Sequence, residues 1–121
     1  MRIIVTGASN WLDTEKIRNE LIKLPIGATI LHGENEGVDI ITAQLAEELK
    51  LETEVWPADW DTHGPRADRL RNGAMVNSDV DLCIAFLMKD ARHNWDCVRK
   101  ARSARIETII VEQDNHEEHQ S

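Results

Sequence analysis

The sequence predicts an α/β domain of Rossmann-like architecture, a three-layer sandwich in which helices cover both faces of a parallel five-stranded sheet. Short runs rich in β-branched residues alternate with longer stretches of helical periodicity. Glycine directly follows two of these runs, as is common where a strand turns tightly toward a helix. The length of 121 residues fits one domain. Right-handed crossovers within that domain give the strand order 3-2-1-4-5.

The first half of the chain is expected to form three strands and two helices. The strands are expected at residues 2–6, 28–32 and 52–56, and the helices at residues 13–24 and 38–50. Asp13 can cap the first helix, and Pro25 with Gly27 ends it. The second helix carries an apolar stripe at helical spacing, formed by Val38, Ile41, Leu45 and Leu49.

The second half is expected to begin with a loop, because residues 58–65 contain proline, glycine, two aspartates and a tryptophan. The expected elements after it are a helix at residues 66–77, a buried strand at 80–87, a helix at 94–104 and a last strand at 107–111. Residues 1–112 then form a single domain. Residues 113–121 are polar and acidic, and we expect this tail to be disordered.

Composition and spacing exclude several classes of protein. No run of about 18 apolar residues is present, so we expect no membrane span, and the apolar start at residues 3–5 is too short for a signal peptide. We therefore expect a cytoplasmic protein. Cys83 and Cys97 lack metal-binding spacing and are expected as free thiols rather than as a disulfide. Neither a metal nor a cofactor is expected.

The charge distribution favours a small phosphorylated partner over a nucleic acid. The net charge of −8 disfavours binding to the phosphate backbones of DNA or RNA. Most of the 14 basic residues, however, lie between Arg66 and Arg105. A locally basic segment of this kind can hold one phosphorylated small molecule, or it can be a solvated helix face.

The predicted strand order places the candidate ligand site at the carboxyl ends of strands 1, 2 and 4, because the order reverses between strands 1 and 4. The first strand leads into Gly7, Ser9, Asn10 and Trp11, a short loop whose backbone amides can bind an anion. Gly7 can also be an ordinary turn residue. The Trp11 ring can stack on a ligand or pack over the following helix.

The loop after the second strand repeats this arrangement. Its candidate ligand-binding residues are His32, Gly33, Glu34, Gly37 and Asp39. The two glycines allow a tight turn and a close approach of the next helix. A carboxylate in the first turn of a helix is favoured in any case, so Asp39 alone does not indicate a site. Two glycine-bearing loops at adjacent strand ends support a ligand site better than either loop alone does.

Four further candidates follow the third strand. Asp59 and Trp60 lie in the long loop, which is dense in aromatic and acidic groups. Arg71 and Asn72 can reach a phosphate or a ribose. Arg71 can equally be one of several solvent-facing arginines.

The segment after the fourth strand lacks the glycines expected at a switch point. Residues 87–96 contain no glycine at all. Lys89 and Arg92 can supply charge in place of amide contacts, or they can be ordinary exposed bases. Asn94 is expected to cap the helix that follows.

Five stretches of the chain together carry a family resemblance that extends to about Val111. They are Val5-Thr6-Gly7 with Trp11 and Asp13, His32-Gly33 with Gly37 and Asp39, Pro57-Ala58-Asp59-Trp60 with His63-Gly64, Arg71-Asn72 with Met75-Val76, and Val80-Asp81-Leu82 to Ala85-Phe86. In this order they resemble the SLOG superfamily, the Rossmann-like group that contains the DprA/SMF and LOG proteins. The closest likeness is to its small YspA-like, cpYpsA-related branch, which occurs in bacteria and phages.

This resemblance implies a nucleotide-related ligand across the ends of strands 1, 2 and 4. LOG relatives hydrolyse the base–ribose bond of a nucleoside monophosphate with an arginine and a carboxylate, and the corresponding residues here are Arg71 and, near the carboxylate position, Asp96. DprA relatives bind single-stranded DNA. The chain departs from the family pattern at Ser9-Asn10, where the branch has Arg-Asp, and at residues 87–94, which replace a glycine-rich phosphate loop.

We therefore expect a protein that binds a nucleotide or a nucleotide-derived phosphate ligand, as a sensor or a sequestering protein. The first alternative is an enzyme resembling the phosphoribohydrolases, with Arg71 and Asp96 as catalytic residues. The second is a module that contacts protein or single-stranded DNA. A homodimer is possible, and if the chain comes from a phage its place is the host cytosol.

Overall fold

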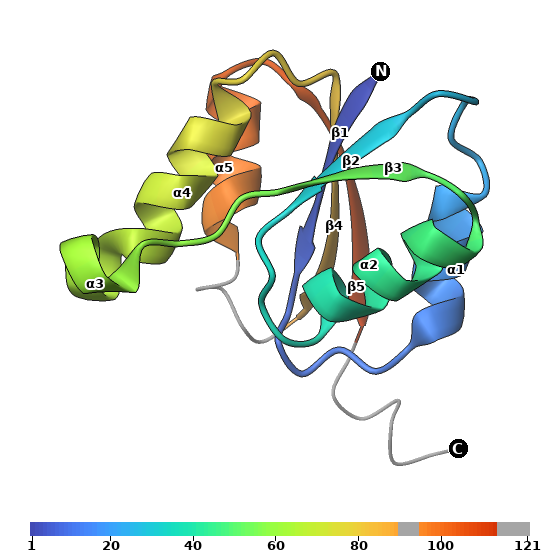
Figure 1. Cartoon of the computed structure of the whole chain (residues 1–121), viewed down its shortest axis with the longest axis horizontal. Helices are drawn as coiled ribbons and strands as arrows, with labels where there is room; N and C mark the ends of the chain where they lie inside the picture. Colours follow the sequence, from blue (N-terminus) through green and yellow to red (C-terminus); the bar gives the residue numbers. More distant parts are fainter. Residues whose placement is uncertain (90–94, 114–121) are drawn as a thin grey trace.

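A five-stranded parallel sheet forms the centre of the molecule, in the predicted order β3-β2-β1-β4-β5. The computed structural model describes residues 1–89 and 95–113 of the chain (Figure 1). The strands are β1 (Arg2–Gly7), β2 (Thr29–His32), β3 (Glu52–Val55), β4 (Leu82–Met88) and β5 (Glu107–Gln113). The predicted Rossmann-like α/β class is confirmed.

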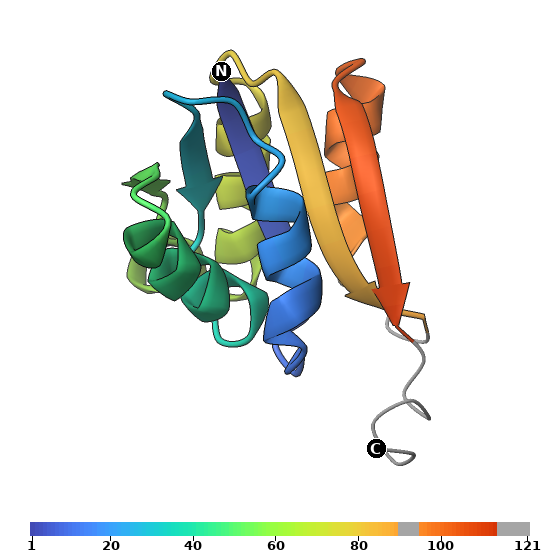
Figure 2. The same ribbon diagram turned by 90° about the vertical axis from the view of Figure 1, so that its right-hand side faces the viewer.

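Helices cover both faces of this sheet. They are α1 (Thr14–Leu21), α2 (Val38–Glu48), α3 (Trp60–His63), α4 (Ala67–Val76) and α5 (Asp96–Ser103), with a 3-10 turn, η1 (Gly64–Arg66), before α4. Helices α1 and α2 lie on one face, and α4 and α5 lie side by side on the other (Figures 1 and 2). The short α3 projects from the N-terminal end of α4 (Figure 1).

Strand β1 lies in the middle of the sheet and contributes to two apolar cores. Ile3 and Val5 belong to the core under α1, together with Ile17. Ile4, between them in the sequence, belongs to the core under α4 and α5, together with Met75. This alternation is the period-two pattern of a strand that is covered on both faces. All residues of the neighbouring β4 are buried for the same reason.

Helix α1 begins as predicted and ends early. The Asp13 carboxylate accepts a hydrogen bond from the Lys16 amide at 3.1 Å, which confirms the predicted cap. The helix ends at Leu21 rather than at residue 24. Leu24 precedes Pro25, and the proline ring disfavours helical backbone at the residue before it.

The prediction of an uninterrupted loop over residues 58–65 is wrong, because α3 and η1 occupy most of that segment. The Asp59 side chain caps α3 by accepting a hydrogen bond from the Thr62 amide at 3.1 Å. Hydrogen bonding from Thr62 also lowers the pKa of Asp59. Pro65 lies in the first turn of η1, where proline is tolerated. A good cap and a well-placed proline outweigh the loop-like composition.

The two strands at the β5 edge run further than predicted. β4 ends at Met88 and β5 at Gln113, and the Lys89 amide still donates to the Gln113 carbonyl at 3.0 Å. The predicted roles of Arg92 and Asn94, and the predicted tail beyond Gln113, lie outside the described residues. Within the described ranges, no helix combines the length and apolarity that a membrane crossing requires.

The two cysteines are buried thiols that lie next to each other between β4 and α5. A hydrogen bond with Cys83 and burial raise the pKa of Cys97 well above its ordinary value. Because the thiolate is the reactive form of cysteine, this environment disfavours reaction at Cys97.

Candidate functional site

The loops after β1 and β2 are built against each other at the carboxyl end of the sheet. A Cβ atom on Gly7 would lie 2.3 Å from the Phe86 carbonyl oxygen and 2.6 Å from Val38 Cγ2. Gly37 has a φ of +73°, and a Cβ atom there would lie 2.3 Å from the Ala8 carbonyl oxygen. The Val38 amide donates to that same oxygen at 3.2 Å. Both glycines therefore allow the N-terminus of α2 to approach β1 closely.

Asp39 holds the loop after β2 in place from behind. It is 5% exposed, and its Oδ2 accepts hydrogen bonds from the Gly33 amide at 3.2 Å and the Asn35 amide at 3.0 Å. Burial raises the pKa of Asp39, while the Asn35 amide and the nearby charge of Arg71 oppose this rise. The carboxylate therefore fixes the loop, and the Arg71 charge lies within its electrostatic reach.

Arg71 is a buried cation of this region, with an exposed fraction of 7%. Its Nη1 donates to the carbonyl oxygens of Gly33 at 3.0 Å and Trp56 at 3.1 Å. Its Nε donates to Asn72 Oδ1 at 2.9 Å. Among the described residues, no carboxylate forms an ion pair with it and no hydrogen bond uses its Nη2. The guanidinium is thus held by oxygen atoms that carry no formal charge.

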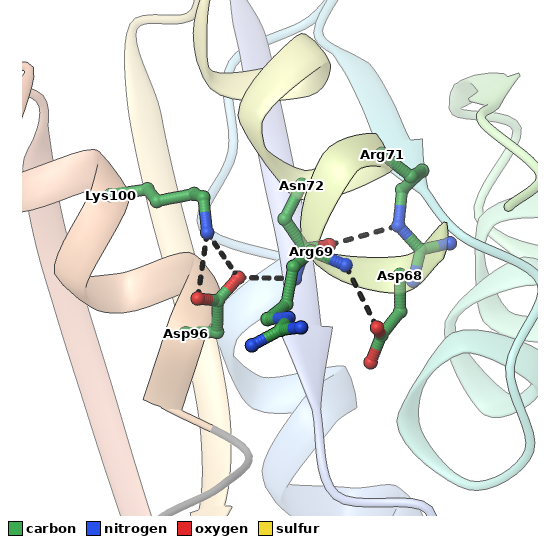
Figure 3. Close-up of polar contacts among 6 residues, drawn as sticks. All are labelled: Asp68, Arg69, Arg71, Asn72, Asp96 and Lys100. Carbon is green, nitrogen blue, oxygen red and sulfur yellow. Dashed lines mark hydrogen bonds and ion pairs between the residues drawn. The ribbon is translucent and has the colours of Figure 1, made fainter. Parts of the chain in front are cut away.

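A line of polar side chains continues from Arg71 to α5 (Figure 3). Asn72 Nδ2 donates to Asp96 Oδ2 at 3.2 Å. Lys100 Nζ lies 2.7 Å from each oxygen of the same Asp96 carboxylate. Asp96 and Lys100 are one helical turn apart in α5, whereas Arg71 and Asn72 come from α4, so these contacts join the two helices.

A polar cleft of about 400 Å³ opens where β1, the loop after β2, and the helices α4 and α5 meet. It is lined by Thr6, Gly7, Asn35, Pro65, Asp68, Arg69, Arg71, Asn72, Asp96 and Arg99. Asp68 accepts a hydrogen bond from the Arg69 amide at 2.8 Å, and both side chains lie near Asn72 (Figure 3). The walls thus present three guanidinium groups and two carboxylates, one of which Lys100 already holds.

The structure brings some of the predicted site residues together and separates others. Gly7, Arg71, Asn72 and Asp96 line the cleft. Three more, Gly33, Gly37 and Asp39, support it from behind through the contacts given above. His32 is buried, accepts a hydrogen bond from the Glu34 amide at 3.4 Å, and lines a hollow beside β3 rather than the cleft.

The remaining predicted residues lie away from the cleft. Ser9 and Asn10 are exposed in the loop after β1. Glu34 lines a different hollow beside β3. Asp59 caps α3, and Trp60 is 52% exposed on that helix.

Trp11 is a core residue, with an exposed fraction of 1%. Its ring packs edge to face on Phe86, with centroids 5.6 Å apart, and its Nε1 donates to the Asp13 carbonyl at 2.9 Å. The ring therefore does not face the cleft. Of the two interpretations of Trp11, the structure shows packing.

Sequence reasoning missed several residues that line the cleft. Asp68 and Arg69 lie three to four residues before Asn72 in α4, and Arg99 lies three residues after Asp96 in α5. This helical spacing places side chains on one face, so it was a usable signal. Asn35 carried no such signal, because its place depends on how Asp39 folds the loop.

Within residues 1–89 and 95–113, no group of three or more histidine, cysteine, aspartate or glutamate side chains is arranged to hold a metal ion. The site that the described residues build is thus one of guanidinium, amide and carboxylate groups. Its chemistry suits a polar ligand that carries negative charge.

Comparison with known proteins agrees with the resemblance carried by the motifs. The sequence model of the YspA, cpYpsA-related SLOG family matches residues 1–63, which include both glycine-bearing loops. The Gene 61 protein of Mycobacterium phage D29 is 32% identical over 117 residues, which cover 89% of this chain and 94% of that protein. No solved structure matches the chain. The chain therefore belongs to the YspA, cpYpsA-related SLOG family.

Proposed function

We propose that the cleft binds a nucleotide or a nucleotide-derived phosphate ligand, and that the protein acts as a sensor or a sequestering protein for it. Membership of the SLOG family and the α/β fold are consistent with a nucleotide-related role. The cleft lies at the carboxyl end of β1, beside the point where the strand order reverses. Ligands of open α/β sheets bind at such a point.

The observation that carries this proposal is the buried, oriented guanidinium of Arg71. Burying a charged group is costly unless it is paired. Within the described residues, Arg71 bonds only to two carbonyls and an amide oxygen, and it lines the cleft. A phosphate oxygen in the cleft supplies an anionic acceptor for Nη2, the nitrogen to which no described residue bonds.

The size and the other charges of the cleft agree with such a ligand. A volume of about 400 Å³ lies within the usual range of small-molecule sites. Arg69 and Arg99 add two more cationic groups to its wall. Because residues 87–94 lack the glycines of a phosphate loop, guanidinium groups take the role that backbone amides have in glycine-rich sites.

A ligand panel tests this proposal directly. AMP, ADP-ribose and cyclic nucleotides at millimolar concentration are added singly, and the melting temperature is measured. A ligand present at about 100 times its Kd adds about 2.7 kcal/mol to the free energy of unfolding, which is a shift of several degrees. We expect at least one compound to give it. A panel that leaves the melting temperature unchanged contradicts the proposal.

Two arginine variants connect the binding to the cleft. Arg71→Lys keeps the charge but removes the planar fork, so it is expected to weaken binding of the active compound. The matched control is Arg102→Lys on α5, because Arg102 is exposed and outside the cleft. Equal weakening by both variants would contradict the assignment of binding to Arg71.

An enzyme is the second candidate, because Asp96 lines the same cleft as Arg71. In that reaction water adds to C1′ of a nucleoside monophosphate and the base leaves with a proton. Lys100 and Asn72 occupy both oxygens of the Asp96 carboxylate, which opposes its use as a base and favours binding alone. Release of free adenine from AMP that Asp96→Asn abolishes would favour the enzyme.

A further inference from the structure

We propose that Asn72, Asp96 and Lys100 are positioning residues, which act as a relay that fixes the direction of the Arg71 guanidinium in the cleft. The proposal rests on the proposed function, since Arg71 is the group that meets the ligand's anionic oxygens. The residues form a chain of hydrogen bonds that begins at Arg71 (Figure 3). Arg71 Nε donates to Asn72 at 2.9 Å, Asn72 donates to Asp96 at 3.2 Å, and Lys100 donates to Asp96 at 2.7 Å. None of them needs to touch the ligand for the relay to act.

The Asn72 amide can join this line in one orientation only. Arg71 Nε is a donor without acceptor capacity, so the oxygen of the amide must face it. An ionised Asp96 is an acceptor without a proton, so the amide nitrogen must face it. The charges at the two ends therefore exclude the flipped amide, which would set donor against donor at Arg71.

Lys100 holds the Asp96 end of the line. Its ammonium lies 2.7 Å from both carboxylate oxygens, and the Asp96 side chain is 20% exposed. Charge-assisted contacts of this geometry are short and strong. They hold the Asp96 carboxylate in place, and through Asn72 this fixes the direction of the Arg71 Nε–H bond.

The relay complements the backbone contacts of Arg71. The carbonyls of Gly33 and Trp56 hold one corner of the guanidinium, Nη1, and Asn72 Oδ1 holds another, Nε. Nη1 donates two hydrogen bonds and Nε donates one, and these three bonds fix the plane of the rigid group, so that the third corner, Nη2, is left for the ligand. Without the hydrogen bond from Nε to Asn72, the guanidinium plane can turn about Nη1. Ligand binding must then order the guanidinium, and the entropy lost in doing so weakens the affinity.

A matched pair of variants separates this relay from plain electrostatics. Asp96→Asn and Asp68→Asn each remove one negative charge from the wall of the same cleft without changing side-chain size. Plain electrostatics predicts tighter anion binding for both variants. The relay predicts opposite signs, because Asp68 bonds to the Arg69 amide and takes no part in the line to Arg71.

The binding experiment is isothermal titration of AMP and, separately, of inorganic phosphate into the full-length protein. We expect Asp68→Asn to bind AMP about twofold or more tighter, and Asp96→Asn to bind it about fivefold or more weaker, because neutral hydrogen bonds replace charge-assisted ones. Asn72→Ala removes the Nε partner without any change of charge, and about tenfold weaker binding is expected. Asp96→Asn binding as tightly as Asp68→Asn would overturn the relay.

A second measurement tests the relay without a ligand. The Nε–H proton of Arg71 is followed by ¹H–¹⁵N NMR in the free protein, where its hydrogen bond should slow exchange with water. Slow exchange is expected in wild type and Asp68→Asn, and fast exchange in Asp96→Asn and Asn72→Ala. Slow exchange in all four proteins overturns the relay. If wild type binds no compound of the panel, the proposed function fails, while this measurement still decides on the relay.

Discussion

Gly33 and Arg71 share one space at the end of β2. A Cβ atom on residue 33 would lie 2.0 Å from Arg71 Nη1 and 2.5 Å from Arg71 Cζ, so the guanidinium rests on the glycine backbone. The same nitrogen donates to the Gly33 carbonyl at 3.0 Å. This glycine therefore makes room for a cation, whereas a glycine in a phosphate loop makes room for an anion.

Gly33→Ala is expected to displace the Arg71 guanidinium, because even a methyl group overlaps it. We expect AMP binding at least about tenfold weaker and a free energy of unfolding lower by about 1–3 kcal/mol, the usual cost of overpacking. Calorimetric titration and urea unfolding measure the two effects. Wild-type affinity in this variant would show that the close contact is not needed for binding.

Gly73→Ala is expected to stabilise the protein. Gly73 lies inside α4, and a Cβ atom there would meet only the Lys100 side chain, at 3.7 Å, an ordinary contact distance. Alanine restricts the unfolded chain more than glycine does, so the free energy of unfolding should rise by about 0.5–1 kcal/mol. Urea unfolding measures this, and a lower stability would refute the prediction.

Trp11→Phe separates packing from ligand stacking at a residue for which the sequence allowed both. The variant loses the hydrogen bond to the Asp13 carbonyl and part of the ring that packs on Phe86. We expect a free energy of unfolding lower by about 1–3 kcal/mol and an AMP affinity within about twofold of wild type. A large loss of affinity in a stable variant would place the ring at the ligand.

Asp39 gives the stability of the protein a defined pH dependence. Burial raises its pKa above the ordinary 3.8, so the folded protein binds this proton more tightly than the unfolded chain does. Its contribution to stability is therefore fully present below the ordinary pKa, and it is lost as pH rises through the raised pKa. Above both pKa values the contribution no longer changes.

Asp39→Asn removes the titrating carboxyl group, so that comparison with wild type gives the contribution of Asp39 to the pH dependence of stability. The stability of wild type relative to Asp39→Asn is expected to fall as pH rises from the ordinary pKa of aspartate through the raised one. Urea unfolding of both proteins at several values between about pH 3.5 and 7 gives the difference. Parallel curves for the two proteins over this interval would contradict the assigned shift.

The fold could be predicted because its signals are local. Runs such as Ile3 to Val5 are apolar enough for a strand covered on both faces, and Asp13 caps a helix by contacts within one turn. The exception was the segment with Asp59 and Pro65. There composition indicated a loop, whereas the positions of these two residues allow a short helix and a 3-10 turn.

The candidate site was harder to predict from the sequence than the fold, because it depends on contacts between distant segments. Arg71 looked either functional or solvent-facing, and its burial follows from the carbonyls of Gly33 and Trp56, far away in the sequence. Asn35 enters the cleft only because Asp39 folds its loop. The contact between Asn72 and Asp96 spans two helices, and no sequence periodicity predicts it.

The bond from Arg71 to the Trp56 carbonyl has a consequence for the outermost strand. β3 pairs with β2 on one side only, and most of its residues are exposed, so this edge should be among the first parts of the sheet to open. Opening it beyond Val55 breaks the bond to Arg71. A ligand that holds Arg71 therefore also slows amide exchange along β3. Ligand binding in the cleft can then be measured as hydrogen exchange at this edge strand of the sheet.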